Sequence, residues 1–363
     1  MLDIWRETII ENPGFYLGWG GLLIGTVFGF IVFRTNFCTM GSISDFMTFG
    51  DFRRFRSWIL AIATAMIGVA LIERGGVADM SLSMYTSSTF TWGANIVGGL
   101  VFGIGMVFGG GCVSKNLMRA GGGDLRSLLV LVVIGITAFM TIGGIFGPFR
   151  VAIFGPVTSD LTALGMSDQR FGTLLATLTG MAAETAALVA LVVVAGGMLI
   201  YVAIDKGFRT SPSHIIAGLG IGLCVIAGWI LTGLAYDDFA DNPTLISLTF
   251  ARPTGDVLDY LMRFTAFSGP GFGVVTTLGT LLGAFLAALS QKKFALATFS
   301  DTSDTLRNLM GAVMMGFGGV VALGCTVGQA VTGFSTLAMG SGLTFIAIVI
   351  GGMIGIKTME ALA

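Results

Sequence analysis

Long apolar segments recur along almost the whole sequence, and they constrain its fold more than any other feature. A helix needs roughly 20 apolar residues to cross a hydrocarbon core about 30 Å thick. Segments of that kind occur about nine times, at 15–33, 57–73, 92–110, 125–144, 172–204, 213–235, 271–290, 306–323 and 341–359. Only 11 % of the residues are charged, whereas a soluble domain carries roughly 25 %. We therefore expect an all-α integral membrane protein with about nine transmembrane helices.

Shorter stretches between these spans have the length of partial helices. Four of them suit re-entrant helices, which enter the membrane without crossing it: 38–48, 113–120, 294–303 and 326–333. The segment 172–204 is too long for one simple crossing, so we expect it to be tilted, bent or preceded by a helix on the membrane surface. Segment 145–170 has mixed polarity and is expected along the interface.

The whole chain, 1–363, is expected to form one polytopic membrane domain. It divides into a first half (15–144), central helices (145–235), an aspartate-rich loop (236–270) and a second half (271–363). Basic residues set the orientation of such a chain, since they are retained on the cytoplasmic side. With the N-terminus outside, 13 of the 19 Lys and Arg residues would lie in inside loops. We therefore expect an outside N-terminus, an outside 236–270 loop and a cytoplasmic C-terminus.

Two cysteines follow glycine-containing breaks in apolar segments. The first break, 109–112, reads Gly-Gly-Gly-Cys, and the second, 323–325, reads Leu-Gly-Cys. Glycine lets the backbone leave helical geometry, and a helix broken inside a membrane exposes N–H groups that can face an anion. The counted spans place Cys112 towards the inside and Cys325 towards the outside, which predicts an inverted repeat. The sequences 24–29 and 278–283 are also similar to each other, but the same count of spans places them in helices that cross the membrane in the same direction.

Polar side chains follow each cysteine within two helical turns and offer hydrogen bonds to an oxyanion. They are Ser114, Lys115, Asn116 and Arg119 after Cys112, and Thr326, Gln329, Thr332 and Ser335 after Cys325. Lys115 and Arg119 also suit positive residues that reach the inner membrane surface. Cys38 alone would be read as an interfacial cysteine, but its polar neighbours make it a third candidate thiol. Cys224 lies in an unbroken apolar run and is interpreted as packing.

Several classes of function lack their residues in this sequence. Four cysteines without zinc spacing and a single histidine indicate no metal site, and no phosphate-binding loop is present. No Cys–His pair with a nearby carboxylate supports hydrolysis, and the net charge of −1 does not suit nucleic acid. We therefore expect neither enzyme activity nor a cofactor. Glu184 is a functional candidate because a charge within a span is costly, unless the helix breaks there.

Three elements, in their order along the chain, resemble the YeeE/YedE family, the sulphur-transport family of bacterial membrane proteins. They are Phe37-Cys38, the run 109–127 around Cys112 and the run 324–335 around Cys325. The resemblance implies nine spans, short helices that dip in from both faces, and import of thiosulfate through three cysteines used as stepping points. Matched by motif, these are Cys325, Cys112 and Cys38, from outside to inside. Ser-Lys-Asn at 114–116 stands where the family typically has Gly-Gln or Gly-x.

Two classes of function remain open at this stage. The first is transport of thiosulfate or a similar sulphur anion, or of a selenium compound, across a bacterial inner membrane. The second is a membrane thiol enzyme that forms a covalent persulfide. The residues expected to contact the substrate are Cys38, Cys112, Cys325, Lys115, Asn116, Gly111, Gly324, Thr326, Gln329 and Arg119. The resemblance also implies a cytoplasmic TusA-like sulphur-carrier protein as partner, for which Arg53, Arg54 and Arg56 are a candidate docking face.

Overall fold

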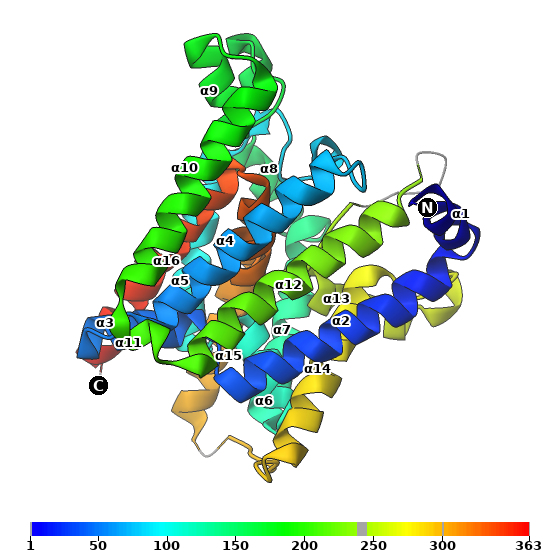
Figure 1. The fold of residues 1–363 in the computed structure, drawn as a ribbon. Helices are drawn as coiled ribbons and strands as arrows, with labels where there is room; N and C mark the ends of the chain where they lie inside the picture. The colour runs from blue at the N-terminus through cyan, green and yellow to red at the C-terminus, as the bar shows by residue number, and fades with distance from the viewer. Residues whose placement is uncertain (1, 238–244, 300, 363) are drawn as a thin grey trace.

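The computed structural model describes residues 2–237, 245–299 and 301–362 and folds them mostly into helices (Figure 1). The long helices are α2 (Pro13–Thr35), α4 (Arg53–Arg74), α5 (Trp92–Phe108), α7 (Leu125–Ile142), α10 (Ala183–Ile204), α12 (Pro212–Leu234), α14 (Phe272–Ser290), α15 (Thr302–Val321) and α16 (Met339–Leu362). The shorter α-helices are α1 (Leu2–Glu11), α3 (Thr39–Phe49), α6 (Val113–Gly121), α8 (Gly147–Phe154), α9 (Phe171–Thr179), α11 (Lys206–Arg209) and α13 (Ala251–Met262).

Tighter and wider helical turns complete the fold, together with one small sheet. The 3₁₀ turns are η1 (Met80–Leu82), η2 (Leu161–Leu164), η3 (Phe264–Ala266) and η5 (Phe334–Thr336), and η4 (Val327–Gly333) is a π-helix. Strand β1 (Thr89–Phe90) pairs antiparallel with β2 (Ser159–Asp160), with Thr89 opposite Asp160.

Eight helical segments among the described residues are long and apolar enough to cross a membrane, one fewer than the sequence predicted. The predicted span 306–323 is helix α15, and its first two turns contain the polar residues Asp304, Arg307 and Asn308. Those residues lower the hydropathy of α15, although its second half is as buried as a core helix, with Met315, Gly316 and Gly318 all enclosed.

Helices α5 and α15 pack antiparallel through small residues at the centre of the molecule. A Cβ at Gly98 would lie 3.0 Å from the carbonyl oxygen of Gly318, and one at Gly105 would lie 2.9 Å from that of Gly311. The glycines therefore allow the two backbones to approach closely. Because the helices are antiparallel, the segments that follow them, which contain Cys112 and Cys325, lie at opposite ends of the pair.

Helices α2 and α14 run parallel and are the most closely associated pair in the fold (Figure 1). Gly25 packs on the backbone of Thr276, and Gly29 packs on the backbone of Thr280. The sequence analysis expected the spans that contain 24–29 and 278–283 to be parallel, and this packing confirms it. Their similar glycine spacing serves mutual packing.

The segment 172–204 divides into two helices, as its length suggested. Gly180 adopts a left-handed conformation with φ of +70° and ends α9, and α10 begins at Ala183. Helix α10 lies at the outer edge of the bundle (Figure 1). Only 17 % of its most apolar 18-residue stretch is buried inside the protein, as expected for a helix that faces lipid. The break places Glu184 in the first turn of α10, where an acidic side chain complements the helix dipole.

Two sequence predictions about the connecting segments were wrong. The stretch 294–303 is extended over its described residues up to 299, where the N–H groups of Ala295 and Ala297 donate to the carbonyls of Gly122 and Gly123 at 3.2 Å. The aspartate-rich segment 236–270 is not simply a loop, because it contains α13, whose first turns are buried against α7 and α14. Two of the aspartates that suggested a loop, Asp238 and Asp241, lie outside the described residues.

Candidate functional site

Cys112 lies between a helix end and a helix start. Gly110 is left-handed, with φ of +70°, and the Gly111 N–H donates to the Met106 carbonyl at 2.7 Å. This is the six-residue bond of a Schellman motif, which closes the C-terminus of a helix. The next residue, Cys112, starts α6, and its carbonyl accepts the Asn116 N–H at 3.0 Å.

Cys325 has the same backbone arrangement. Leu323 is left-handed, with φ of +60°, and the Gly324 N–H donates to the Gly319 carbonyl at 2.7 Å. Cys325 follows, and its carbonyl accepts the Gln329 N–H at 2.8 Å, at the start of η4. Each bond of the first turn therefore has its equivalent in the second, although leucine replaces glycine at the left-handed position.

Cys38 has this arrangement too, which the sequence did not predict. Asn36 is left-handed, with φ of +53°, and the Phe37 N–H donates to the Val32 carbonyl at 3.3 Å. Cys38 then caps α3 and is 2 % exposed, so it is a buried residue and not an interfacial one. The available signal was Asn36, since asparagine tolerates the left-handed region better than other non-glycine residues. The short helices expected at 38–48, 113–120 and 326–333 are thus the helices that the three cysteines begin.

Each thiol lies among hydrogen-bond donors at the N-terminus of its helix. The Cys38 sulfur accepts the Gly41 N–H at 3.4 Å, and the Cys112 sulfur is 3.2 Å from the Ser114 hydroxyl oxygen. The Cys325 sulfur faces the backbone N–H groups of Gly328, Phe250 and Val327. All four cysteines of the chain are free and buried. Helix N-termini carry partial positive charge and favour anions.

The three cysteines that begin helices are neighbours in the fold. Cys112 is close enough to interact electrostatically with both Cys38 and Cys325. Cys224 is in the middle of α12, and burial among apolar neighbours is its only resolved influence. The interpretation of Cys224 as a packing residue agrees with this position.

The two amide side chains predicted to contact substrate hold the turns. The Asn116 side-chain nitrogen donates to the carbonyls of Gly109, Gly111 and Cys112 at 2.9 to 3.3 Å. The Gln329 side-chain nitrogen donates to the Ala322 carbonyl at 2.5 Å. Both residues lie four positions after their cysteine, and each satisfies carbonyls that the broken helix leaves free.

Of the two predicted cations, Lys115 is near the thiols and Arg119 is engaged elsewhere. The Lys115 ammonium hydrogen-bonds Asn36, in the turn before Cys38, and interacts with both Cys38 and Cys112. Arg119 donates to the Gly110 carbonyl at 3.1 Å and forms an ion pair with Asp124 at 2.7 Å. Arg119 therefore supports the turn, whereas Lys115 supplies positive charge between the two thiols.

Buried polar atoms without a hydrogen-bond partner cluster at two of the turns. Within the described residues there are seven such side-chain atoms, from Thr39, Trp58, Tyr85, Arg150, Thr326, Gln329 and Thr344. Thr39 follows Cys38, and the Trp58 ring stacks at 4.2 Å on Phe37. Thr326 follows Cys325. Trp58 and Tyr85 were missed from the sequence, because neither lies near a glycine break or a cysteine along the chain.

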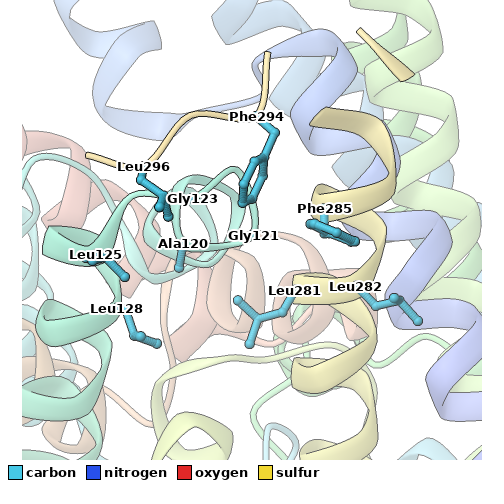
Figure 2. Close-up of a pocket in the computed structure, with 10 residues that line it drawn as sticks. All are labelled: Ala120, Gly121, Gly123, Leu125, Leu128, Leu281, Leu282, Phe285, Phe294 and Leu296. Carbon is cyan, nitrogen blue, oxygen red and sulfur yellow. The ribbon is translucent and has the colours of Figure 1, made fainter. Parts of the chain in front are cut away.

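The cavities of the molecule differ sharply in polarity. A cleft of about 1050 Å³ between α4, α10 and η5 is lined in part by Glu73, Asp168, Arg170 and Glu184, and Arg170 pairs with Glu73 at 2.7 Å and with Asp168 at 2.8 Å. A pocket of about 440 Å³ between α6, α7 and α14 is lined only by apolar residues, among them Leu281 (Figure 2). Such a lining suits an acyl chain or an apolar side chain and not an anion.

The arginine cluster predicted as a docking face is already neutralised. Arg53 pairs with Asp51 at 2.7 Å, Arg54 with Asp45 at 3.3 Å and Arg56 with Asp205 at 3.3 Å. The cluster therefore presents ion pairs at this surface and not three unpaired cations.

Apolar helices and thiols buried at broken-helix N-termini define a multi-pass membrane protein with sites suited to an anion. Residues 34–354 match the model of the sulphur transport family, and the chain belongs to that family. It is 27 % identical over 335 residues to the thiosulfate transporter TsuA of Escherichia coli, covering 85 % of each chain. It is 26 % identical over 342 residues to the thiosulfate transporter TsuA of Spirochaeta thermophila, covering 92 % of this chain and 96 % of that relative.

Proposed function

We propose that this protein carries thiosulfate, or a similar sulphur-containing anion, into the cytoplasm of a bacterium past the three thiols. The observation that carries the proposal is that Cys38, Cys112 and Cys325 share one broken-helix arrangement, and that Cys112 is a neighbour of both other thiols. The two thiosulfate transporters to which the chain is similar support the choice of substrate. The anion would pass Cys325 first, then Cys112, then Cys38.

The chemistry of each turn suits brief binding of a dianion. A neutral thiol donates only a weak hydrogen bond, and the helix N-terminus adds a fraction of a positive charge. Together they offset part of the cost of removing the anion from water without holding it tightly. Weak sites in series allow an ion both to enter and to leave. Lys115 adds attraction at the two inner thiols, Cys112 and Cys38.

The proposed path requires the two ends of the α5–α15 pair to face opposite sides of the membrane. We propose that α15 is the ninth span and that the N-terminus is outside and the C-terminus inside. The antiparallel packing of α5 and α15, with equivalent turns after each, supports an inverted repeat. A cytoplasmic sulphur-carrier protein as recipient is proposed from family resemblance alone.

Uptake of labelled thiosulfate tests the proposal in bacterial cells that lack their own route. Wild type is expected to restore uptake. Cys38→Ala, Cys112→Ala and Cys325→Ala should each abolish most of it, because one binding site along the path (a station) loses its thiol hydrogen-bond donor. Cys224→Ala is the matched control and should transport normally. Wild-type protein that is present in the membrane but moves no thiosulfate would reject the substrate. Normal uptake by any of the first three variants would reject that cysteine as a station.

The same assay separates transport from the covalent alternative. A serine hydroxyl still donates a hydrogen bond but cannot form a sulphur–sulphur bond. Partial uptake by Cys112→Ser is therefore expected if the thiols only bind the anion. Complete loss of uptake in each of the three single variants, Cys38→Ser, Cys112→Ser and Cys325→Ser, would favour a persulfide mechanism.

A further inference from the structure

The hydroxyl of Tyr85 is a buried donor next to the outermost thiol. Tyr85 is 3 % exposed, and its hydroxyl interacts electrostatically with Cys325. It lies beside the Thr249 side chain without reaching hydrogen-bond geometry, so it is unpaired. Because an unpaired buried polar group destabilises a folded protein, each one needs an explanation.

The ring of Tyr85 is held along the helix that Cys325 begins. A Cβ at Gly333 would lie 2.8 Å from the ring, and one at Gly328 would lie 3.5 Å from the hydroxyl oxygen. These glycines are five residues apart in η4, so they lie on one face of a π-helix, which has i to i+5 bonds. Their missing side chains leave room for the ring. The Gly328 N–H, next to the hydroxyl, also faces the Cys325 sulfur.

The loop that carries Tyr85 is fixed without using the Tyr85 hydroxyl. The Thr86 hydroxyl donates to the carbonyls of Met80 at 2.8 Å and Ser83 at 2.9 Å. The Tyr85 N–H approaches the Ser83 hydroxyl oxygen at 3.4 Å. Tyr85 is therefore oriented by its backbone and its ring, and the hydroxyl is available to a ligand. Burial raises the pKa of Tyr85, so the hydroxyl remains protonated and can donate.

We propose that Tyr85 is a substrate-binding residue, whose hydroxyl donates a hydrogen bond to an oxygen of the anion at Cys325. This inference rests on the proposed function and adds a residue to it. The Thr326 hydroxyl, also buried and unpaired, is a second donor at the same station. The Gln329 side-chain oxygen is a further buried and unpaired polar atom in the same helix. Two neutral hydroxyls and a thiol would recognise an oxyanion without the strong retention that a lysine would give.

The test compares Tyr85→Phe with Tyr201→Phe, its matched control. Tyr201 is 38 % exposed near the opposite end of the fold, where its ring contacts Arg56. Loss of a hydrogen bond to a charged group should raise the KM for thiosulfate uptake about tenfold or more in Tyr85→Phe. In purified protein without substrate, Tyr85→Phe should unfold at the same temperature as wild type or higher, since it removes an unpaired group. The rise in unfolding temperature on adding thiosulfate should shrink in Tyr85→Phe and remain in Tyr201→Phe.

Two results would overturn the inference. One is a KM and a thiosulfate-induced stabilisation equal to those of wild type. The other is a lower unfolding temperature of Tyr85→Phe without substrate, which would show a structural hydroxyl. Sulfate and selenite, tested in parallel, separate this inference from the choice of substrate. If selenite alone stabilises wild type and Tyr85→Phe loses that effect, the thiosulfate assignment fails and the role of Tyr85 stands. If none of the three anions stabilises wild type, Tyr85 has no anion to bind and the inference fails.

Discussion

At the scale of single residues, the site depends on backbone conformation more than on side-chain identity. The left-handed residue before each thiol is Asn36, Gly110 or Leu323, three residues of different chemistry. Asparagine and glycine accept this conformation readily, whereas leucine does so at a cost of roughly 1–2 kcal/mol. A costly conformation retained inside a buried turn indicates that the surrounding structure fixes it.

Gly111→Ala should destabilise the first cysteine turn more than Gly324→Ala destabilises the second. Gly111 has φ of +145°, and an added Cβ would lie 2.6 Å from the Lys115 side chain. We expect a loss of about 1–3 kcal/mol from the backbone strain alone. Gly324 has no left-handed φ, and its Cβ would lie 3.2 Å from the Gln329 side chain. Thermal unfolding of both variants in detergent measures the difference, and an equal loss would contradict the role given to the φ of Gly111.

At the scale of helices, direct backbone contact between small residues holds the bundle together. Lipid is as apolar as a leucine side chain, so association in a membrane depends on close packing and not on the hydrophobic effect. Helices α2 and α14 meet at Gly25, Gly29, Gly279 and Gly283, where carbonyls of the facing helix occupy the space of the absent Cβ atoms. Helix α14 also packs on α6, which Cys112 begins.

Gly29→Val should separate α2 from α14, whereas Gly18→Val on the same helix should be tolerated. A side chain at Gly29 would overlap the backbone of Thr280, and nothing lies within 4 Å of a Cβ at Gly18. Overpacking of this kind costs about 1–3 kcal/mol or more. The unfolding temperature and the yield of folded protein are the measurements. Equal stability of the two variants would show that the α2–α14 contact does not hold the fold together.

At the scale of the whole molecule, the sequence was sufficient for the membrane class and for three of the four expected short helices. It failed at α13, because Arg252, Asp256, Asp259 and Arg263 suggest a solvated loop. In the fold, Arg252 pairs with Asp256 at 3.6 Å and Arg263 with Asp259 at 2.6 Å, along one helix, while the first turns of α13 are buried. It also failed at 294–303, since the extended backbone there depends on carbonyls of a distant turn.

The candidate site was also predictable only in part, because some of its contacts join segments that are far apart in the sequence. Glycine and cysteine at 109–112 and 323–325 can be recognised along the chain. Cys38 was recognised as a thiol, but the turn formed by Asn36 before it was not. The approach of Tyr85 to Cys325 joins segments 240 positions apart, and local sequence patterns contain no information about such a contact.

The proposed orientation predicts which of two single-cysteine labels is accessible from outside. Ser268 follows α13 and Ser290 ends α14, and both are exposed. With the N-terminus outside, Ser268→Cys should react with a membrane-impermeant thiol reagent in intact cells, and Ser290→Cys should react only after the membrane is opened. The four natural cysteines are buried and give little background. The opposite pattern would invert the topology and the direction of the proposed path.

The hydrogen bond between Lys115 and Asn36 links the helix begun by Cys112 to the turn that precedes Cys38. In the proposed path, an anion at either thiol would draw on the same ammonium, so the charge that attracts the ion to Cys112 would be shared with Cys38, the thiol it reaches next. Two anions side by side at these positions would compete for one cation and repel each other. The inner half of the proposed path would therefore hold one anion at rest, and an arriving ion would promote the departure of the one ahead of it.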